Sequence, residues 1–202
     1  MNTVKQLDAT MTEAAVVTDF SIGDMWDQLP EYSAQANKLG VAINDMYGAT
    51  TLYYQQGLKT NEAMALGVET MKMAKIAGME TTDATKAMTS ALRGFNMELN
   101  ETSATKVNDV YSQLAAVTAA DTNQIATAME KTASIAAAAN MEFETTAAFL
   151  AQIIETTQEA PETAGTALKT IIARFSEVKS LRDQGLLTGE DSEGEGIDVN
   201  KI

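Results

Sequence analysis

Apolar residues recur along this chain at the spacing of one face of an α-helix. In three stripes the members follow one another at intervals of three and four residues, which is typical of an amphipathic helix. No segment alternates strictly between apolar and polar residues, so we expect no β-sheet. The stripes are Val107, Val110, Tyr111, Leu114 and Val117; Ala84, Ala87, Met88, Ala91, Leu92 and Phe95; and the expected core stripe Leu168, Ile171, Ile172 and Phe175, which continues to Val178.

Helix ends are also readable, because six positions place glycine or asparagine directly before an apolar residue. These two residue types tolerate the positive φ that commonly ends a helix, and the apolar residue that follows packs back onto the last turn. The predicted helix stops are Gly40, Gly57, Gly78, Gly94, Asn140 and Gly185.

Stripes and stops together predict an all-α fold of about nine short helices without a sheet. Because the connections are short, we expect successive helices to pack as antiparallel hairpins in a compact multi-helix bundle. We expect an N-terminal helical segment (1–29), a helical core domain (30–187) and an acidic, glycine-rich loop or frayed end (188–202). The expected helices are 4–19, 30–39, 43–56, 61–77, 82–93, 101–118, 122–139, 144–159 and 161–183.

A weak internal echo accompanies this pattern. Ala77-Gly78-Met79-Glu80 recurs later in the chain as Ala139-Asn140-Met141-Glu142, and each copy leads into a helix. A repeat of helical units explains it, and chance in a chain rich in alanine and methionine explains it equally well.

The composition excludes several function classes. With 28 acidic and 14 basic residues, the formal net charge is −14, which disfavours a nucleic-acid-binding site because such sites neutralise phosphates. Histidine and cysteine are absent, so catalytic triads and thiol chemistry are impossible. The longest uncharged run, residues 46–58, is too short for a membrane-spanning helix of about 20 residues. We therefore predict no enzyme, no cofactor, no metal site and no membrane segment.

The acidic pairs in the chain support this prediction. Glu142 and Glu144 are best explained by the preference of a helix N-terminus for negative charge. The later group of Glu190, Asp191, Glu193 and Glu195 is best explained as a solvated loop, because it lacks the spacing of a calcium-binding loop.

One segment is a candidate interface. Tyr53, Tyr54, Gln55, Gln56 and Leu58 form the densest group of aromatic and amide side chains, and tyrosines at an uncharged helix end can anchor a partner. Core packing at a helix stop, with the amides holding the last carbonyls, is the interpretation we favour.

The 12 methionines also admit two interpretations. A methionine-lined face can be an adaptable binding surface, but methionine more often fills an irregular helical core. The residues in question are Met64, Met71, Met73, Met88 and Met97.

Two segments resemble the conserved helical core region of phage tail tape measure proteins. Residues 36–41 and 53–58 resemble its opening, and residues 164–169 with Ile171, Ile172 and Phe175 resemble its end. The resemblance covers roughly residues 18–182, and family members are far longer than this chain. It implies a phage or prophage protein, made in the bacterial cytoplasm and located in the virion tail, as a fragment of a longer chain.

The family resemblance implies a structural role without catalysis. Tape measure proteins set tail length, are coated by tail assembly chaperones, and have tail tube proteins polymerised around them. Homo-oligomerisation is left open, because nothing in this sequence encodes a stoichiometry.

The frequent helix stops add a constraint, since a ruler needs long uninterrupted helices. We expect this region to be an assembly or docking element at one end of the ruler, with its acidic surface meeting basic partner surfaces. The alternative is a stand-alone cytosolic adaptor that binds a partner helix in a methionine-rich groove.

Overall fold

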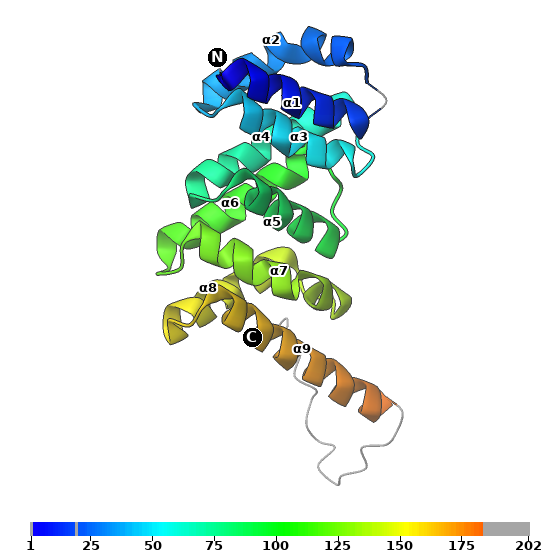
Figure 1. The fold of residues 1–202 in the computed structure, drawn as a ribbon. Coiled ribbons are helices and arrows are strands. Elements are labelled where there is room, and N and C mark those ends of the chain that lie inside the picture. The colour runs from blue at the N-terminus through cyan, green and yellow to red at the C-terminus, as the bar shows by residue number, and fades with distance from the viewer. Residues whose placement is uncertain (1, 19, 184–202) are drawn as a thin grey trace.

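The computed structural model describes residues 2–18 and 20–183 (Figure 1). These residues form nine α-helices and no strand, so the prediction of an all-α fold is confirmed for this part of the chain. The helices are α1 (Asn2–Val16), α2 (Ile22–Leu39), α3 (Ile43–Tyr54), α4 (Thr60–Ala77), α5 (Thr81–Gly94), α6 (Glu101–Val117), α7 (Thr122–Ala138), α8 (Phe143–Thr157) and α9 (Pro161–Asp183).

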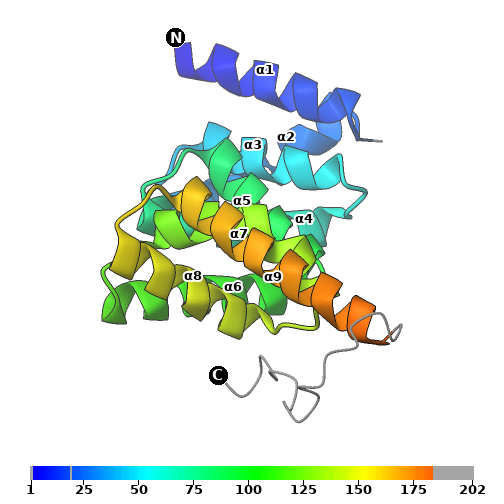
Figure 2. The same ribbon diagram turned by 90° about the horizontal axis from the view of Figure 1, so that it is seen from below.

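The helices stack in two rows. In the odd row each helix packs on the next odd one, from α1 through α3, α5 and α7 to α9. In the even row α2, α4, α6 and α8 pack in the same succession. The bundle is therefore drawn out into a two-layer stack, with α1 and α2 at one end and α8 and α9 at the other (Figure 1). Seen from below, α9 overlies α7, with which it is in contact (Figure 2).

The stack has a regular period. The even-row helices begin at Ile22, Thr60, Glu101 and Phe143. The odd-row helices after α1 begin at Ile43, Thr81, Thr122 and Pro161. Within either row, one helix begins about 40 residues after the one before it, which is the length of a typical helical repeat. The echo between residues 77–80 and 139–142 does not match this period, because Gly78 ends an even-row helix and Asn140 follows an odd-row helix. The repeating unit is thus a helical hairpin, and its stability comes from stacking on the neighbouring units.

The start of α2 differs from the expectation. Ser21 and Asp24 form a capping box, in which the Asp24 amide donates to Ser21 Oγ and the Ser21 amide donates to Asp24 Oδ2. The side-chain hydrogen bond from Ser21 lowers the pKa of Asp24. The helix therefore begins at Ile22, and the expected start at Pro30 is wrong, since Pro30 lies inside the helix. The boundary expected between residues 29 and 30 falls within α2.

Four of the six predicted stops have left-handed backbone. The φ angles of Gly40, Gly57, Gly78 and Asn140 are 66°, 86°, 64° and 60°. The following apolar residue folds back as expected: at Gly78, for example, the Met79 amide donates to the carbonyl of Ala74 at 2.9 Å. Gly185 lies outside the described residues.

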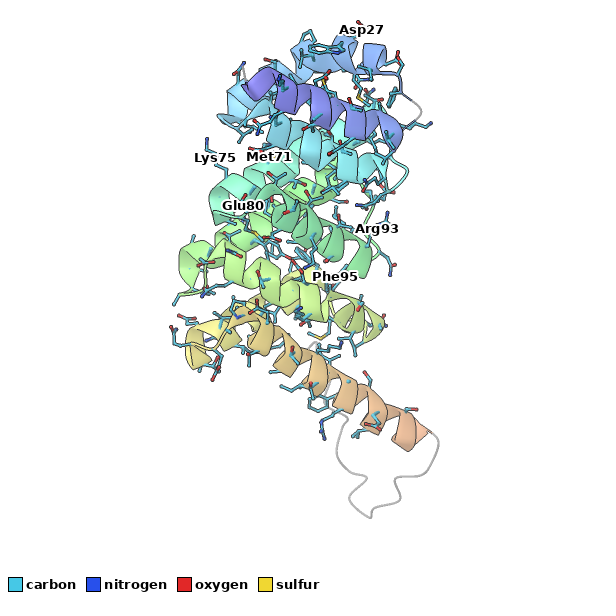
Figure 3. All side chains as sticks on the ribbon, in the orientation of Figure 1. Asp27, Met71, Lys75, Glu80, Arg93 and Phe95 are labelled. Carbon is cyan, nitrogen blue, oxygen red and sulfur yellow. The ribbon has the colours of Figure 1, made fainter. Side chains whose placement is uncertain are left out.

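α5 ends at Gly94, where a stop was predicted, but Gly94 is not the left-handed residue. The left-handed residue is Asn96, with φ 53°, and the Met97 amide donates to the carbonyl of Leu92 at 2.8 Å. A Cβ built on Gly94 would lie 2.5 Å from Ala133 Cβ, so this glycine allows α5 to approach α7. Figure 3 shows its neighbours, Arg93 and Phe95, at the end of α5.

The methionines named above fill the core. Met64, Met71, Met73 and Met88 are buried, and Met97 is partly buried against them. Their flexible side chains suit the irregular spaces between stacked helices.

One polar contact lies inside this apolar stack. Glu69 of α4 is 2% exposed, and the Asn108 amide group of α6 donates to its Oε2 and to its backbone carbonyl, each at 2.9 Å. Lys72 pairs with the other carboxylate oxygen at 2.5 Å while remaining partly in solvent. Buried hydrogen bonds of this kind between two helices fix how the helices are registered against each other.

Replacing Gly78 by valine should lower the free energy of unfolding by about 1–2 kcal/mol, the cost of a left-handed conformation for a residue with a Cβ. A Cβ at this position meets nothing within 4 Å, so the loss would come from the backbone alone. Gly48, helical and equally open, is the matched control, and Gly48→Val should cost much less. Urea unfolding of both variants measures the difference, and equal losses would contradict a capping role.

Candidate interaction surfaces

The acidic residues that the sequence offered as a candidate chemical site, Glu142 and Glu144, stabilise helix α8 and its contact with α6. Glu142 is the residue before the first turn of α8, and Glu144 pairs with Lys106 at 2.5 Å. The hydrogen bond from Lys106 lowers the pKa of Glu144. Among the described residues, no three acidic side chains gather closely enough to hold a metal ion. The late acidic group, residues 190–195, lies outside the described part of the chain.

The two predicted interface tyrosines belong to a buried cluster that joins α2, α3 and α4. Tyr53 is fully buried, and its hydroxyl lies 2.6 Å from Thr70 Oγ1 of α4. Tyr54 pairs through its hydroxyl with that of Tyr32 at 3.0 Å, and Tyr32 stacks on Tyr47 with ring centroids 4.0 Å apart. Burial raises the pKa of Tyr53 to about 12, so this hydroxyl stays protonated at physiological pH. These tyrosines chiefly hold adjacent helices together.

The two glutamines of the candidate interface, Gln55 and Gln56, differ in exposure and in their contacts. Gln55 is exposed, whereas the side chain of Gln56 reaches the next odd-row helix. The Gln56 amide nitrogen donates to Thr89 Oγ1 at 3.4 Å, and Arg93 Nε donates to Gln56 Oε1 at 3.0 Å. Gln56 therefore bridges α3 and α5 rather than holding the last carbonyls of its own helix.

A surface hollow of about 650 Å³ opens beside this cluster. Tyr54 and Leu58 form one wall, and the connection between α1 and α2 forms the other. Val16 is 80% exposed at its rim, so apolar surface faces solvent here. The remaining lining residues are Val17, Thr18, Phe20, Gly57, Lys59 and Thr60.

The other apolar surface lies on α9, where half of the expected core stripe is wrong. Leu168 and Ile172 are buried, but Ile171 and Phe175 are each 47% exposed, and Val178 is 53% exposed. Figure 1 shows the reason: the C-terminal half of α9 extends past the neighbouring helices. We call Ala167, Ile171, Phe175 and Val178 the α9 face.

The sequence pattern indicated some residues of both surfaces, Tyr54 and Leu58 at the hollow and Ile171 and Phe175 on the α9 face, but did not show that they form exposed surfaces. Val16 and Val17 of the hollow were missed, because the first helix was expected to continue to residue 19, whereas it ends at Val16. The α9 face follows helical spacing, and that spacing is the same whether a face is buried or uncovered. None of the described helices has both the length and the apolar character needed to cross a membrane.

Comparison with known proteins gives two matches. The phage-related minor tail protein family matches residues 45–202. A tape measure protein of Pneumococcus phage Dp-1 is 30% identical over 135 residues, which cover 64% of this chain and 12% of that protein. The chain thus spans a small part of the length of this relative. No solved structure matches the chain significantly.

Proposed function

This chain belongs to the phage-related minor tail protein family, and from this premise we propose that it is a non-catalytic helical stack of a tail tape measure protein. In this role it contributes to tail assembly and to the determination of tail length. Its partners are tail tube proteins and tail assembly chaperones, and its place is the virion tail. The family match, which runs from α3 through α9 and beyond, is the observation that carries the proposal.

The shape of the stack favours a role in binding assembly partners over a role as the ruler that sets tail length. A ruler is extended, whereas here the longest described helix, α9, has 23 residues and successive helices turn back on one another. The two rows present broad surfaces, and stacked hairpins commonly bind partners along such surfaces. We therefore propose that this region docks assembly partners at one end of the ruler.

The charge differs between the two rows and suggests which face meets a basic partner. The even-row helices carry nine acidic and four basic residues, whereas the odd-row helices carry eight of each. A face with net negative charge favours encounter with basic protein surfaces and disfavours encounter with acidic ones. We propose the even row as the face toward the tube or chaperone protein.

Deleting residues 22–183 in frame from the phage gene should abolish tails of regular length, with the remaining protein still produced. Electron microscopy of lysates gives tail length, and an antibody to the remaining protein confirms its production. A phage that carries Gly48→Ala, at an open helical position, controls for the genetic manipulation. Tails shortened in proportion to the deletion would make the region part of the ruler instead. Tails of normal length and number would contradict both roles.

A further inference from the structure

The odd-row helices share a pattern that the sequence alone did not reveal. Counted from the first residue of each helix, the seventh position is alanine in α3, α5, α7 and α9. In the first three it is buried, and the eleventh position is fully buried as well. In α9 both positions are exposed. The seventh residues are Ala49, Ala87, Ala128 and Ala167, and the eleventh are Tyr53, Ala91, Thr132 and Ile171.

In α7 these positions face the next helix of the odd row, α9. Thr132 Oγ1 donates to the carbonyl of Gly165 in α9 at 2.8 Å. A Cβ built on Gly165 would overlap the backbone carbonyl of Ala128, so α9 lies directly against the seventh position of α7. One unit earlier, Gly94 of α5 meets Ala133 of α7 in a similar close approach. The small residues thus mark where one odd-row helix receives the next.

On α9 the corresponding surface has no helix on it among the described residues. Its members follow one another at four, four and three residues, from Ala167 through Ile171 and Phe175 to Val178, so they lie along one side of the helix. The buried Ala164, Leu168 and Ile172 lie beside them and hold α9 on the stack.

The opposite end of the stack is built differently. α1 buries Leu7, Met11 and Ala14 against the stack, and most of its outward residues are polar, among them Lys5, Asp8 and Glu13, with Val16 exposed at its C-terminal end. A polar outer face is what closes the end of a stack of repeats. The outer face of α1 is therefore mostly polar, apart from Val16 at its end, whereas α9 presents an apolar surface of the kind that neighbouring units cover elsewhere.

We propose that the α9 face receives a further helix of the same polypeptide, the first helix of the next hairpin unit. The Dp-1 relative, of which this chain matches 12%, is long enough to supply such units. The mostly polar outer face of α1 disfavours a second copy stacked head to tail, because it offers α9 little apolar partner surface. The incoming helix should carry glycine or alanine opposite Ala167, as Gly165 stands opposite Ala128.

A photo-crosslinking amino acid at position 171 of the full-length protein, purified from the producing host, tests this assignment. We expect crosslinks to residues beyond 202 of the same chain, identified by mass spectrometry, on a band that keeps the mass of the monomer. The same amino acid at Thr166, on a different side of α9, is the control and should give few such crosslinks. Crosslinks to a second copy or to another protein would overturn the proposal, as would a yield at 171 no higher than at 166.

A second measurement does not depend on crosslinking. In the full-length protein, Ala167→Trp should displace the incoming helix and speed trypsin cleavage at Arg174, which is exposed beside the α9 face, on the order of tenfold. Thr166→Trp should leave the cleavage rate unchanged. Equal rates for the two variants would overturn the proposal. Neither readout depends on whether tails assemble, so a failure here is distinct from a failure of the proposed function.

Discussion

Replacing Gly165 by leucine should separate α9 from α7 and lower the free energy of unfolding by about 3 kcal/mol. The position leaves no room for a side chain, since even a Cβ would overlap the carbonyl oxygen of Ala128 and lie 3.0 Å from Lys131 Cβ. Backbone atoms of a packed helix cannot move aside as a flexible side chain can, so the whole of α9 would have to shift. The shift would also break the hydrogen bond from Thr132 to the carbonyl of Gly165.

Leucine is a better helix former than glycine by about 0.8–1 kcal/mol, which offsets only part of this loss. Thr166→Leu is the matched control, because Thr166 is the next residue of the same helix and is exposed. Thermal and urea unfolding of the two variants measure the difference. If Gly165→Leu were as stable as Thr166→Leu, the close contact between α7 and α9 would be wrong.

Replacing Asn108 by aspartate should destabilise the protein by about 2–4 kcal/mol at pH 7. The amide nitrogen of Asn108 now donates two hydrogen bonds to Glu69, and Glu69 is 2% exposed. Aspartate would remove both donors and set a second carboxylate against the first. Oδ1 of Asn108 has no hydrogen-bond partner among the described residues, so the new carboxylate finds no donor there either.

The repulsion should depend on pH in a predictable direction. A neighbouring negative charge raises the pKa of a carboxyl, and protonation of the aspartate introduced at position 108 removes the repulsion. The stability difference between Asn108→Asp and the unchanged protein should therefore shrink as the pH falls from 7 toward 5. Asn108→Ala, which loses the hydrogen bonds without adding charge, should show a difference that stays nearly constant. Parallel curves for the two variants would contradict the predicted repulsion.

Local interactions explain why so many helix boundaries were readable from the sequence. A left-handed residue such as Gly78 or Asn140 acts within its own turn, and the apolar residue after it contacts the residue five positions earlier. The same holds for Pro161, whose ring suits the first turn of α9. Where prediction failed locally, two signals competed: Pro30 suggested a helix start, but the capping box at Ser21 begins α2 well before it.

The candidate surfaces needed more than local signals. Gly94 and Gly78 look alike in sequence, yet one allows α5 to approach α7 and the other ends α4, because only Gly94 has a neighbouring helix where its side chain would be. The buried hydroxyl of Tyr53 contacts Thr70, which belongs to the next helix along the chain, and residue spacing within one helix does not show such a contact.

By itself the sequence determined the helical content, most of the stops and the absence of histidine and cysteine chemistry, since each depends on residue type and short-range spacing. Only the tertiary structure decided which apolar faces are covered. Leu168 and Ile171 belong to one stripe, yet Leu168 is buried and Ile171 is half exposed. Spacing along a helix fixes the side on which a residue lies, whereas burial depends on whether another helix reaches that side.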